Sequence, residues 1–186
     1  MGGSKRQDMK VILISGKATC GKDTFANLLE NELTLQNKKV LICHFADLVK
    51  YIATKFFNWN GEKDEYGRTL LQHIGTENVR SIYPNFWVDF ICDILKVFNG
   101  SWDYVLIPDT RFPNEIDIPI SRGLNAISVR IERPNHISGL TEEQLNHTSE
   151  TALDDYKFNY YIENEGNMDD LKNTAKDFIE MLNKEI

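Results

Sequence analysis

The segment Gly16–Thr24 has the residue types and spacing that binding of phosphate groups requires. It reads Gly-Lys-Ala-Thr-Cys-Gly-Lys-Asp-Thr, which is a glycine, four residues, a second glycine and a lysine. Such a loop points successive backbone N–H groups at phosphate oxygens, and its lysine adds a positive charge. The segment therefore predicts a site for the phosphates of a nucleoside triphosphate. Its candidate contacts are Gly16, Lys17, Ala18, Thr19, Cys20, Gly21, Lys22, Asp23 and Thr24.

Positions 23 and 20 of this loop each allow two interpretations. The residue after Lys22 is commonly Ser or Thr, but here it is Asp23, so we expect Thr24 to supply the hydroxyl for a magnesium ion. Cys20 could be a redox switch, although the interpretation as a spacer that presents its N–H is favoured.

A second group of reactive side chains follows a short apolar run, in Asp109-Thr110-Arg111-Phe112-Pro113-Asn114-Glu115. Asp109 could hold Mg²⁺ or cap a turn, and we favour the metal role. Arg111 could stabilise the charge on a transferred phosphoryl group. Glu115 could act in the site or simply favour the N-terminus of a helix. Lys22, Arg111 and Asp109 are thus the candidate catalytic residues.

Residues 46–98 are longer than an ordinary connection, and such an excess often carries function. Arg68 and Arg80 offer two guanidinium groups suited to a monophosphate, and Gln72 and Thr76 lie at helical spacing from Arg68. Trp87 could stack on a base, but a core position is the more common use of a large aromatic.

Two further positions have open roles. Asp47 follows a strand, where it could touch the acceptor or cap the next helix. The polar segment 133–150 resembles a lid that would exclude water from the phosphates. Arg133 is its preferred cation for the donor phosphates, ahead of Arg130, which lies inside a strand pattern. We expect His147 to have a structural rather than a general-base role.

The elements that must position these residues alternate between strands and helices. Helical spacing marks Phe25–Leu33, most of residues 46–98, with breaks near 58–61 and 83–85, and Met168–Leu182. The expected strands are Lys10–Ser15, Val40–Phe45, Tyr104–Pro108, Leu124–Ile131 and Asn159–Glu163. This alternation predicts an α/β fold with a mainly parallel sheet, as one domain over residues 1–186.

The arginines of the sequence lie in the same part of the chain as these candidate residues. The net charge is −7, which argues against general binding to nucleic acid or membranes. However, residues 134–186 hold 12 acids and 4 lysines, while residues 1–133 have a net charge of +1 and contain all seven arginines. Three cysteines without metal-ligand spacing, no apolar run of about 20 residues and a polar start predict a reduced, cytoplasmic setting.

Taken together, these motifs resemble the deoxynucleoside monophosphate kinases of phages and bacteria. The resemblance rests on Gly-Lys-Asp-Thr at 21–24, Phe-Ala-Asp at 45–47, Tyr-Gly-Arg-x-Leu-Leu-Gln-x-x-Gly-Thr at 66–76, residues 109–115 and His-x-Ser-Glu at 147–150. It implies a P-loop kinase with a three-layer α/β/α core, a five-stranded parallel sheet, a helical acceptor-binding insert (46–98) and a lid (133–150). It further implies transfer of the γ-phosphoryl group of ATP to a deoxynucleoside monophosphate with Mg²⁺.

By matching position, the resemblance implies that Lys22 and Thr24 contact the donor. Arg68 and its neighbours would contact the acceptor, and Arg111 would contact both substrates. The alternatives are a kinase of phosphomevalonate or dephospho-coenzyme A, and a nucleotide-binding regulatory module. The last would need a guanine-reading Asn-Lys-x-Asp motif, which the sequence lacks. The expected partner is a small nucleotide, and the oligomeric state stays open between a monomer and a homodimer.

Overall fold

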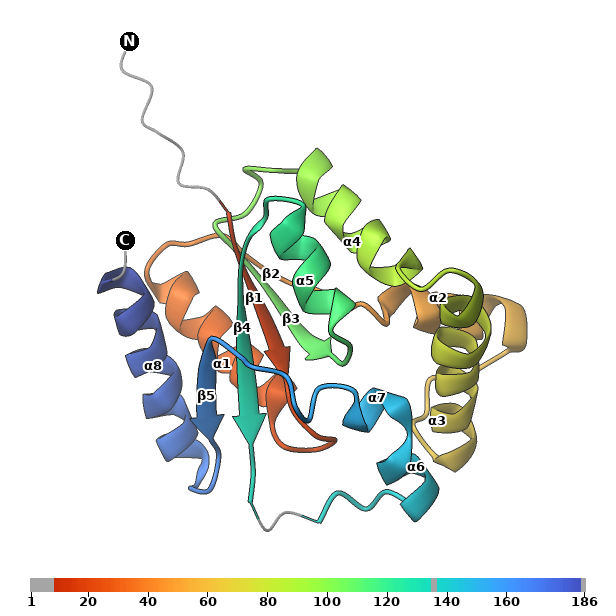
Figure 1. Ribbon diagram of the computed structural model, residues 1–186. Coiled ribbons are helices and arrows are strands. Elements are labelled where there is room, and N and C mark those ends of the chain that lie inside the picture. Colours follow the sequence, from red (N-terminus) through yellow and green to blue (C-terminus); the bar gives the residue numbers. More distant parts are fainter. Residues whose placement is uncertain (1–8, 135–136, 185–186) are drawn as a thin grey trace.

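The computed structural model describes residues 9–134 and 137–184. Five parallel strands form one sheet in the order β2-β3-β1-β4-β5 (Figure 1). Their bounds are β1 Lys10–Ser15, β2 Val40–Ile42, β3 Tyr104–Thr110, β4 Asn125–Glu132 and β5 Tyr160–Glu163. The fold expected from the alternating pattern is confirmed.

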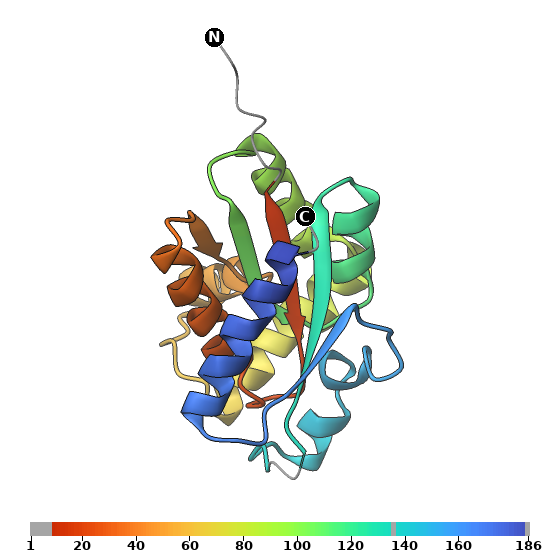
Figure 2. The ribbon, with the colours of Figure 1, turned by 90° about the vertical axis from the view of Figure 1, so that its left-hand side faces the viewer.

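The alternation of side chains along β1 explains the layers. Ile12 and Ile14 point to one face of the sheet, where they join a core with α1 (Lys22–Leu35) and α8 (Met168–Lys184). Figure 2 shows α8 lying across that face beside α1. Val11 and Leu13 point to the other face, which α4 (Phe86–Val97) and α5 (Asn114–Ser121) cover.

The insert builds a small core of its own at one end of the sheet. Its other elements are α2 (Asp47–Phe57), α3 (Glu65–Gln72) and the π-helix η1 (His73–Arg80). Val49, Ala53, Trp59, Ile74 and Trp87 are buried together between them. The predicted breaks near residues 58–61 and 83–85 are confirmed, since α2 ends at Phe57 and α4 begins at Phe86.

The predicted lid is more regular than its polar sequence suggested. It contains two short helices, α6 (Glu142–Asn146) and α7 (Thr148–Thr151). Thr141 and Gln144 form a reciprocal capping box that stabilises the start of α6. The His147 side chain accepts a hydrogen bond from the N–H of Ser149, so it caps α7.

Because all five strands run parallel, their carboxyl ends meet at one edge of the sheet. The P-loop follows β1, the turn into α2 follows β2, and the Asp109 segment ends β3. This edge therefore brings together the candidate residues that the sequence spreads over more than 100 positions. No helix among the described residues has both the length and the apolar character that crossing a bilayer requires.

Candidate active site

The P-loop (residues 16–24) turns sharply between β1 and α1. Gly16 and Gly21 have φ angles of +152° and +105°, in the region that glycine adopts most readily. A Cβ atom at Gly16 would lie 2.4 Å from the carbonyl oxygen of Ile131, so glycine is also needed for the close approach to β4. The sequence therefore forms this loop because only glycine fits at its two ends.

The Lys22 side chain folds back over the loop. Its ammonium group donates hydrogen bonds of 2.8 Å to the carbonyl oxygen of Gly16 and 2.7 Å to that of Lys17. The residue is only 6% exposed, and this burial, with a smaller effect of the nearby Arg111 charge, lowers the pKa of Lys22 to about 8. An incoming anion would stabilise the charged form of Lys22 and relieve this unfavourable environment.

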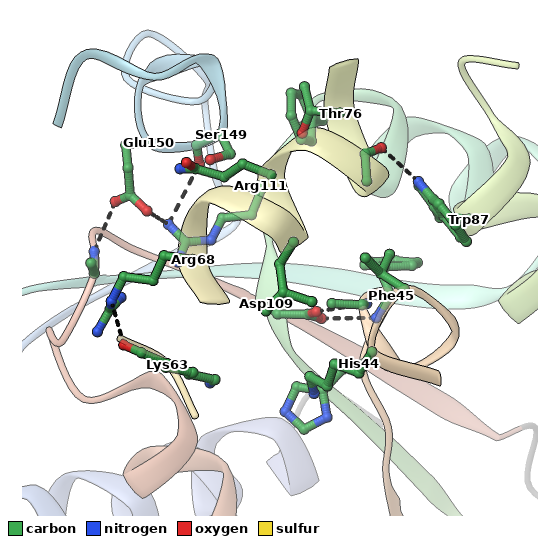
Figure 3. Close-up of a pocket in the computed structure, with 18 of the residues that line it drawn as sticks. His44, Phe45, Lys63, Arg68, Thr76, Trp87, Asp109, Arg111, Ser149 and Glu150 are labelled. Carbon is green, nitrogen blue, oxygen red and sulfur yellow. Dashed lines mark hydrogen bonds and ion pairs between the residues drawn. The ribbon is translucent and has the colours of Figure 1, made fainter. Parts of the chain in front are cut away.

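Arg111 lies against the phosphate loop and is held there from the lid side. Its guanidinium group donates a 2.5 Å hydrogen bond to the Glu150 carboxylate on α7 (Figure 3). The other oxygen of Glu150 accepts a 2.9 Å hydrogen bond from the backbone N–H of Ala18. The Glu150 carboxylate thus joins the lid both to the P-loop, through Ala18, and to the end of β3, through Arg111.

Glu115 organises the segment that carries Arg111. Its buried carboxylate accepts hydrogen bonds from the backbone N–H groups of Arg111, at 2.7 Å, and Phe112, at 3.1 Å. It also forms an ion pair of 2.6 Å with Arg80, whose guanidinium lies 3.9 Å from the centre of the Phe112 ring. Burial raises the pKa of Glu115 despite the Arg80 charge. The carboxylate and Arg80 together fix the shape of this turn.

Asp109 links the ends of two strands. Its two carboxylate oxygens accept 3.0 Å hydrogen bonds from the backbone N–H groups of Phe45 and Ala46 (Figure 3). These contacts hold the turn between β2 and α2 in place. Each oxygen retains a further lone pair, so this structural role and a metal role are compatible.

A cavity of about 470 Å³ lies between the P-loop, the insert and the lid. Of the loop residues, Ala18, Thr19, Lys22 and Asp23 line it, whereas Thr24 does not. The structure brings to the same cavity most of the other predicted site residues, namely Asp109, Arg111, Arg68, Gln72, Thr76, Arg80 and Trp87. Donor and acceptor candidates therefore face one space.

The side of this cavity on which the acceptor was predicted to bind is formed by α3 and η1. The Arg68 Nε–H donates to the carbonyl oxygen of Lys63 at 3.0 Å, which holds the side chain at the cavity wall (Figure 3). Trp87 is 2% exposed, and its indole N–H donates to the Gly75 carbonyl of the π-helix at 2.8 Å. This burial favours a packing role for Trp87, whose use in base stacking stays a prediction.

Besides five residues of the P-loop (Gly16, Lys17, Cys20, Gly21 and Thr24), two predicted site residues lie outside the cavity lining. Asp47 is the first residue of α2, and its carboxylate accepts a hydrogen bond from the His44 N–H in the preceding turn at 2.9 Å and pairs with Lys50 at 2.9 Å. Arg133 is exposed just after β4 and does not line the cavity either. Their proposed contacts with substrate would need a different arrangement of these segments.

Sequence reasoning missed several residues that line the cavity, and they include His44, Lys50, Lys63 and Glu150. His44 lies 3.1 Å from the Asp23 carboxylate, and its hydrogen bonds to Asp23 and Asp47 raise the pKa of His44 to about 9. His44 therefore adds a positive charge beside the P-loop at neutral pH. Its position next to the Phe-Ala-Asp motif at 45–47 was the only available signal.

The oxygen donors of the cavity suit a hard divalent cation. Asp23 and Asp109 both line it, and carboxylate oxygens are the ligands that Mg²⁺ prefers. Among the described residues, no group of three or more His, Cys, Asp or Glu side chains could hold a metal by itself.

Solved structures share this fold. The APS kinase of Mycobacterium tuberculosis in complex with AMPPNP and APS is 11% identical, with a TM-score of 0.56, and 95% of this chain and 98% of that chain are covered. The dephospho-CoA kinase of Campylobacter jejuni is 14% identical, with a TM-score of 0.52 and coverage of 93% and 97%. At such low identity, the comparison establishes the P-loop kinase fold alone.

Sequence comparison is more specific. The deoxynucleotide monophosphate kinase of Enterobacteria phage T4 is 29% identical over 126 residues, which are 66% of this chain and 49% of the relative. An uncharacterised protein of Ictalurid herpesvirus 1, ORF77, is 38% identical over 115 residues, which are 61% and 48% of the two chains. The chain thus spans about half the length of these curated relatives.

The family model for deoxynucleotide monophosphate kinase matches residues 30–175, which contain the insert, the Asp109 segment and the lid. The P-loop precedes the matched range and is identified by its own spacing and geometry. The motifs that suggested the resemblance and the match of the family model therefore agree, and the chain belongs to the deoxynucleotide monophosphate kinase family.

Proposed function

We propose that this protein transfers the γ-phosphoryl group of ATP to a deoxynucleoside monophosphate, giving the diphosphate and ADP. The observation that carries the proposal is the shared cavity, because Lys22 and Arg111 face the same space as Arg68, Gln72 and Thr76. Phosphoryl transfer requires two phosphates to meet in line, and the main work of the protein is to position them and neutralise their charge. Family membership supports this choice of acceptor.

Each residue has a defined part in the proposed reaction. The P-loop N–H groups and Lys22 bind the donor phosphates, and Arg68 binds the phosphate of the acceptor. Arg111, held beside the P-loop by Glu150 of the lid, stabilises charge on the group in transfer. The lid and the insert exclude water that would otherwise hydrolyse ATP. The acceptor is already a phosphate, so no side chain needs to act as a strong general base.

A magnesium ion, when bound, would neutralise charge on the phosphates. Asp109 is the proposed ligand that lines the cavity, and Asp23 is a second candidate there. Thr24, the ligand expected from the sequence, does not line the cavity and stays a prediction. The proposed reaction needs neither nucleic acid nor a membrane, and the three free cysteines agree with a cytoplasmic setting.

The test is ADP release with ATP, Mg²⁺ and a panel of acceptors. The panel holds the four deoxynucleoside monophosphates, AMP, GMP, CMP, UMP, phosphomevalonate and dephospho-coenzyme A. We expect at least one deoxynucleoside monophosphate to stimulate ADP release far above the rate without acceptor. Stimulation by phosphomevalonate or dephospho-coenzyme A alone would contradict the proposed acceptor, since the fold itself is compatible with several.

A further inference from the structure

The carboxylate of Glu150 occupies a position that suits a phosphate group. It accepts hydrogen bonds from the N–H of Ala18 in the P-loop, at 2.9 Å, and from the guanidinium of Arg111, at 2.5 Å. Its side chain is 8% exposed. A backbone N–H of a phosphate loop and an arginine are the donors that phosphate oxygens use. The two carboxylate oxygens thus make contacts that two phosphate oxygens would otherwise make.

Further contacts of the same kind hold α7 against the P-loop. The ammonium group of Lys17 donates a 2.7 Å hydrogen bond to the backbone carbonyl of Glu150 and forms an ion pair with Asp154. Arg111 also donates to the carbonyl oxygen of Ser149, at 3.5 Å. The cations in these contacts are Lys17 of the P-loop and Arg111. The acceptors lie on α7 or in the turn that follows it. The short helix is therefore held by groups that a nucleotide would use.

A triphosphate and the Glu150 carboxylate cannot both occupy this position. They carry charge of the same sign and would compete for the Ala18 N–H and the Arg111 guanidinium, in a site where burial weakens screening. One of them must leave. Because Glu150 lies on a helix of four residues near the surface, it can move without disturbing the sheet.

We propose that Glu150 is a latch, a carboxylate that competes with the phosphates of the donor for the Ala18 N–H and Arg111. Its carboxylate holds α7 on the P-loop and occupies Arg111, and the terminal phosphates of the donor displace it. Donor binding then releases α7 and makes Arg111 available to the group in transfer. The inference rests on the proposed function only in taking the P-loop as the donor site.

The latch lowers the affinity for the donor, because part of the binding free energy is used to displace Glu150. Isothermal titration with AMPPNP measures this in the full chain, for the natural protein, Glu150→Gln and Glu150→Ala. Glu143→Gln is the matched control, because Glu143 is an exposed acid of α6 and the substitution removes the same charge. We expect the Kd to fall about tenfold in both Glu150 variants and to change less than twofold in Glu143→Gln.

The Arg111→Ala variant tests whether Glu150 acts through its contact with Arg111. In Arg111→Ala the carboxylate has lost its cationic partner, so adding Glu150→Gln should lower the Kd by less than it does in the natural protein. An unchanged or weaker affinity in both Glu150 variants would overturn the latch and leave the proposed function standing. If no variant binds AMPPNP or inorganic tripolyphosphate, both the latch and the P-loop donor site are wrong.

Discussion

The guanidinium of Arg80 lies 2.6 Å from the carboxylate of Glu115, and the two side chains are only 14% and 3% exposed. This ion pair joins the last turn of η1 to the turn that carries Arg111. It connects the insert (residues 46–98) to the β3 edge beside the phosphate loop. The position of Arg111 therefore depends on a carboxylate that accepts a hydrogen bond from its backbone N–H.

Glu115→Ala should destabilise the protein by about 3 kcal/mol, because it leaves the Arg80 guanidinium without its partner in a poorly hydrated place. For a chain of this size, that loss corresponds to a fall in Tm of roughly 6–12 °C. Glu115→Gln keeps an acceptor for the backbone N–H groups and should cost less. Thermal unfolding followed by circular dichroism measures both. Equal Tm values for the natural protein and Glu115→Ala would show that the pair is not important for stability.

Arg111→Ala should lower kcat by about 10²–10³, which is typical of removing a group that stabilises charge in a transition state. The fold should persist, because Glu115 holds the backbone of this turn rather than the Arg111 side chain. The measurement is steady-state kinetics at saturating ATP. Arg122→Ala is the control, since Arg122 pairs with Asp89 and Asp93 outside the cavity. Similar kcat values in the two variants would remove Arg111 from the catalytic assignment.

Arg68→Ala should act on the acceptor. Loss of a charged hydrogen-bonding group costs about 1.5–2 kcal/mol, which raises the KM for the deoxynucleoside monophosphate by roughly ten- to thirtyfold. The KM for ATP should change little. Lys55→Ala, on the exposed side of α2, provides the control. A rise in the KM for ATP alone would place Arg68 on the donor side instead.

The lowered pKa of Lys22, about 8, predicts how donor affinity depends on pH. Below pH 8 the side chain is charged in the free protein, and above it a proton must be taken up when the phosphates bind. The Kd for AMPPNP, measured without Mg²⁺, should therefore be flat near pH 7 and rise above pH 8 by up to about tenfold per unit.

His44, with a pKa of about 9, also lines the cavity, so a variant must separate the two groups. In Lys22→Met the rise should begin about one pH unit higher and the affinity at pH 7 should be lower. A rise above pH 8 that Lys22→Met leaves unchanged would mean that another group controls donor binding.

The sequence contained most of the information about the fold. The apolar strands Lys10–Ser15 and Tyr104–Thr110 were visible because parallel strands buried on both faces form short apolar runs. The lid helices were not, because α6 depends on a local capping box and α7 has only four residues. Neither leaves a periodic apolar pattern that a sequence can reveal.

The site was predicted less completely than the fold, because the sequence does not show how side chains are oriented. Sequence position placed Asp47 and Arg133 at the correct edge of the sheet, but it did not show which way their side chains turn. Asp47 bonds to its own turn, and Arg133 is exposed. Glu150 was invisible as a ligand of the P-loop because its contact with Ala18 spans 132 residues. Such pairings depend on tertiary structure.

The most direct test of the account is to follow the phosphoryl group itself. The protein is incubated with Mg²⁺, ATP labelled at the γ-phosphate and each deoxynucleoside monophosphate, and the products are separated by chromatography. We predict that the label appears in a deoxynucleoside diphosphate, in an amount equal to the ADP formed, and that Lys22→Ala abolishes the transfer. Label found only in inorganic phosphate, or transfer unaffected by Lys22→Ala, would contradict the assignment of this cavity as the site of the kinase reaction.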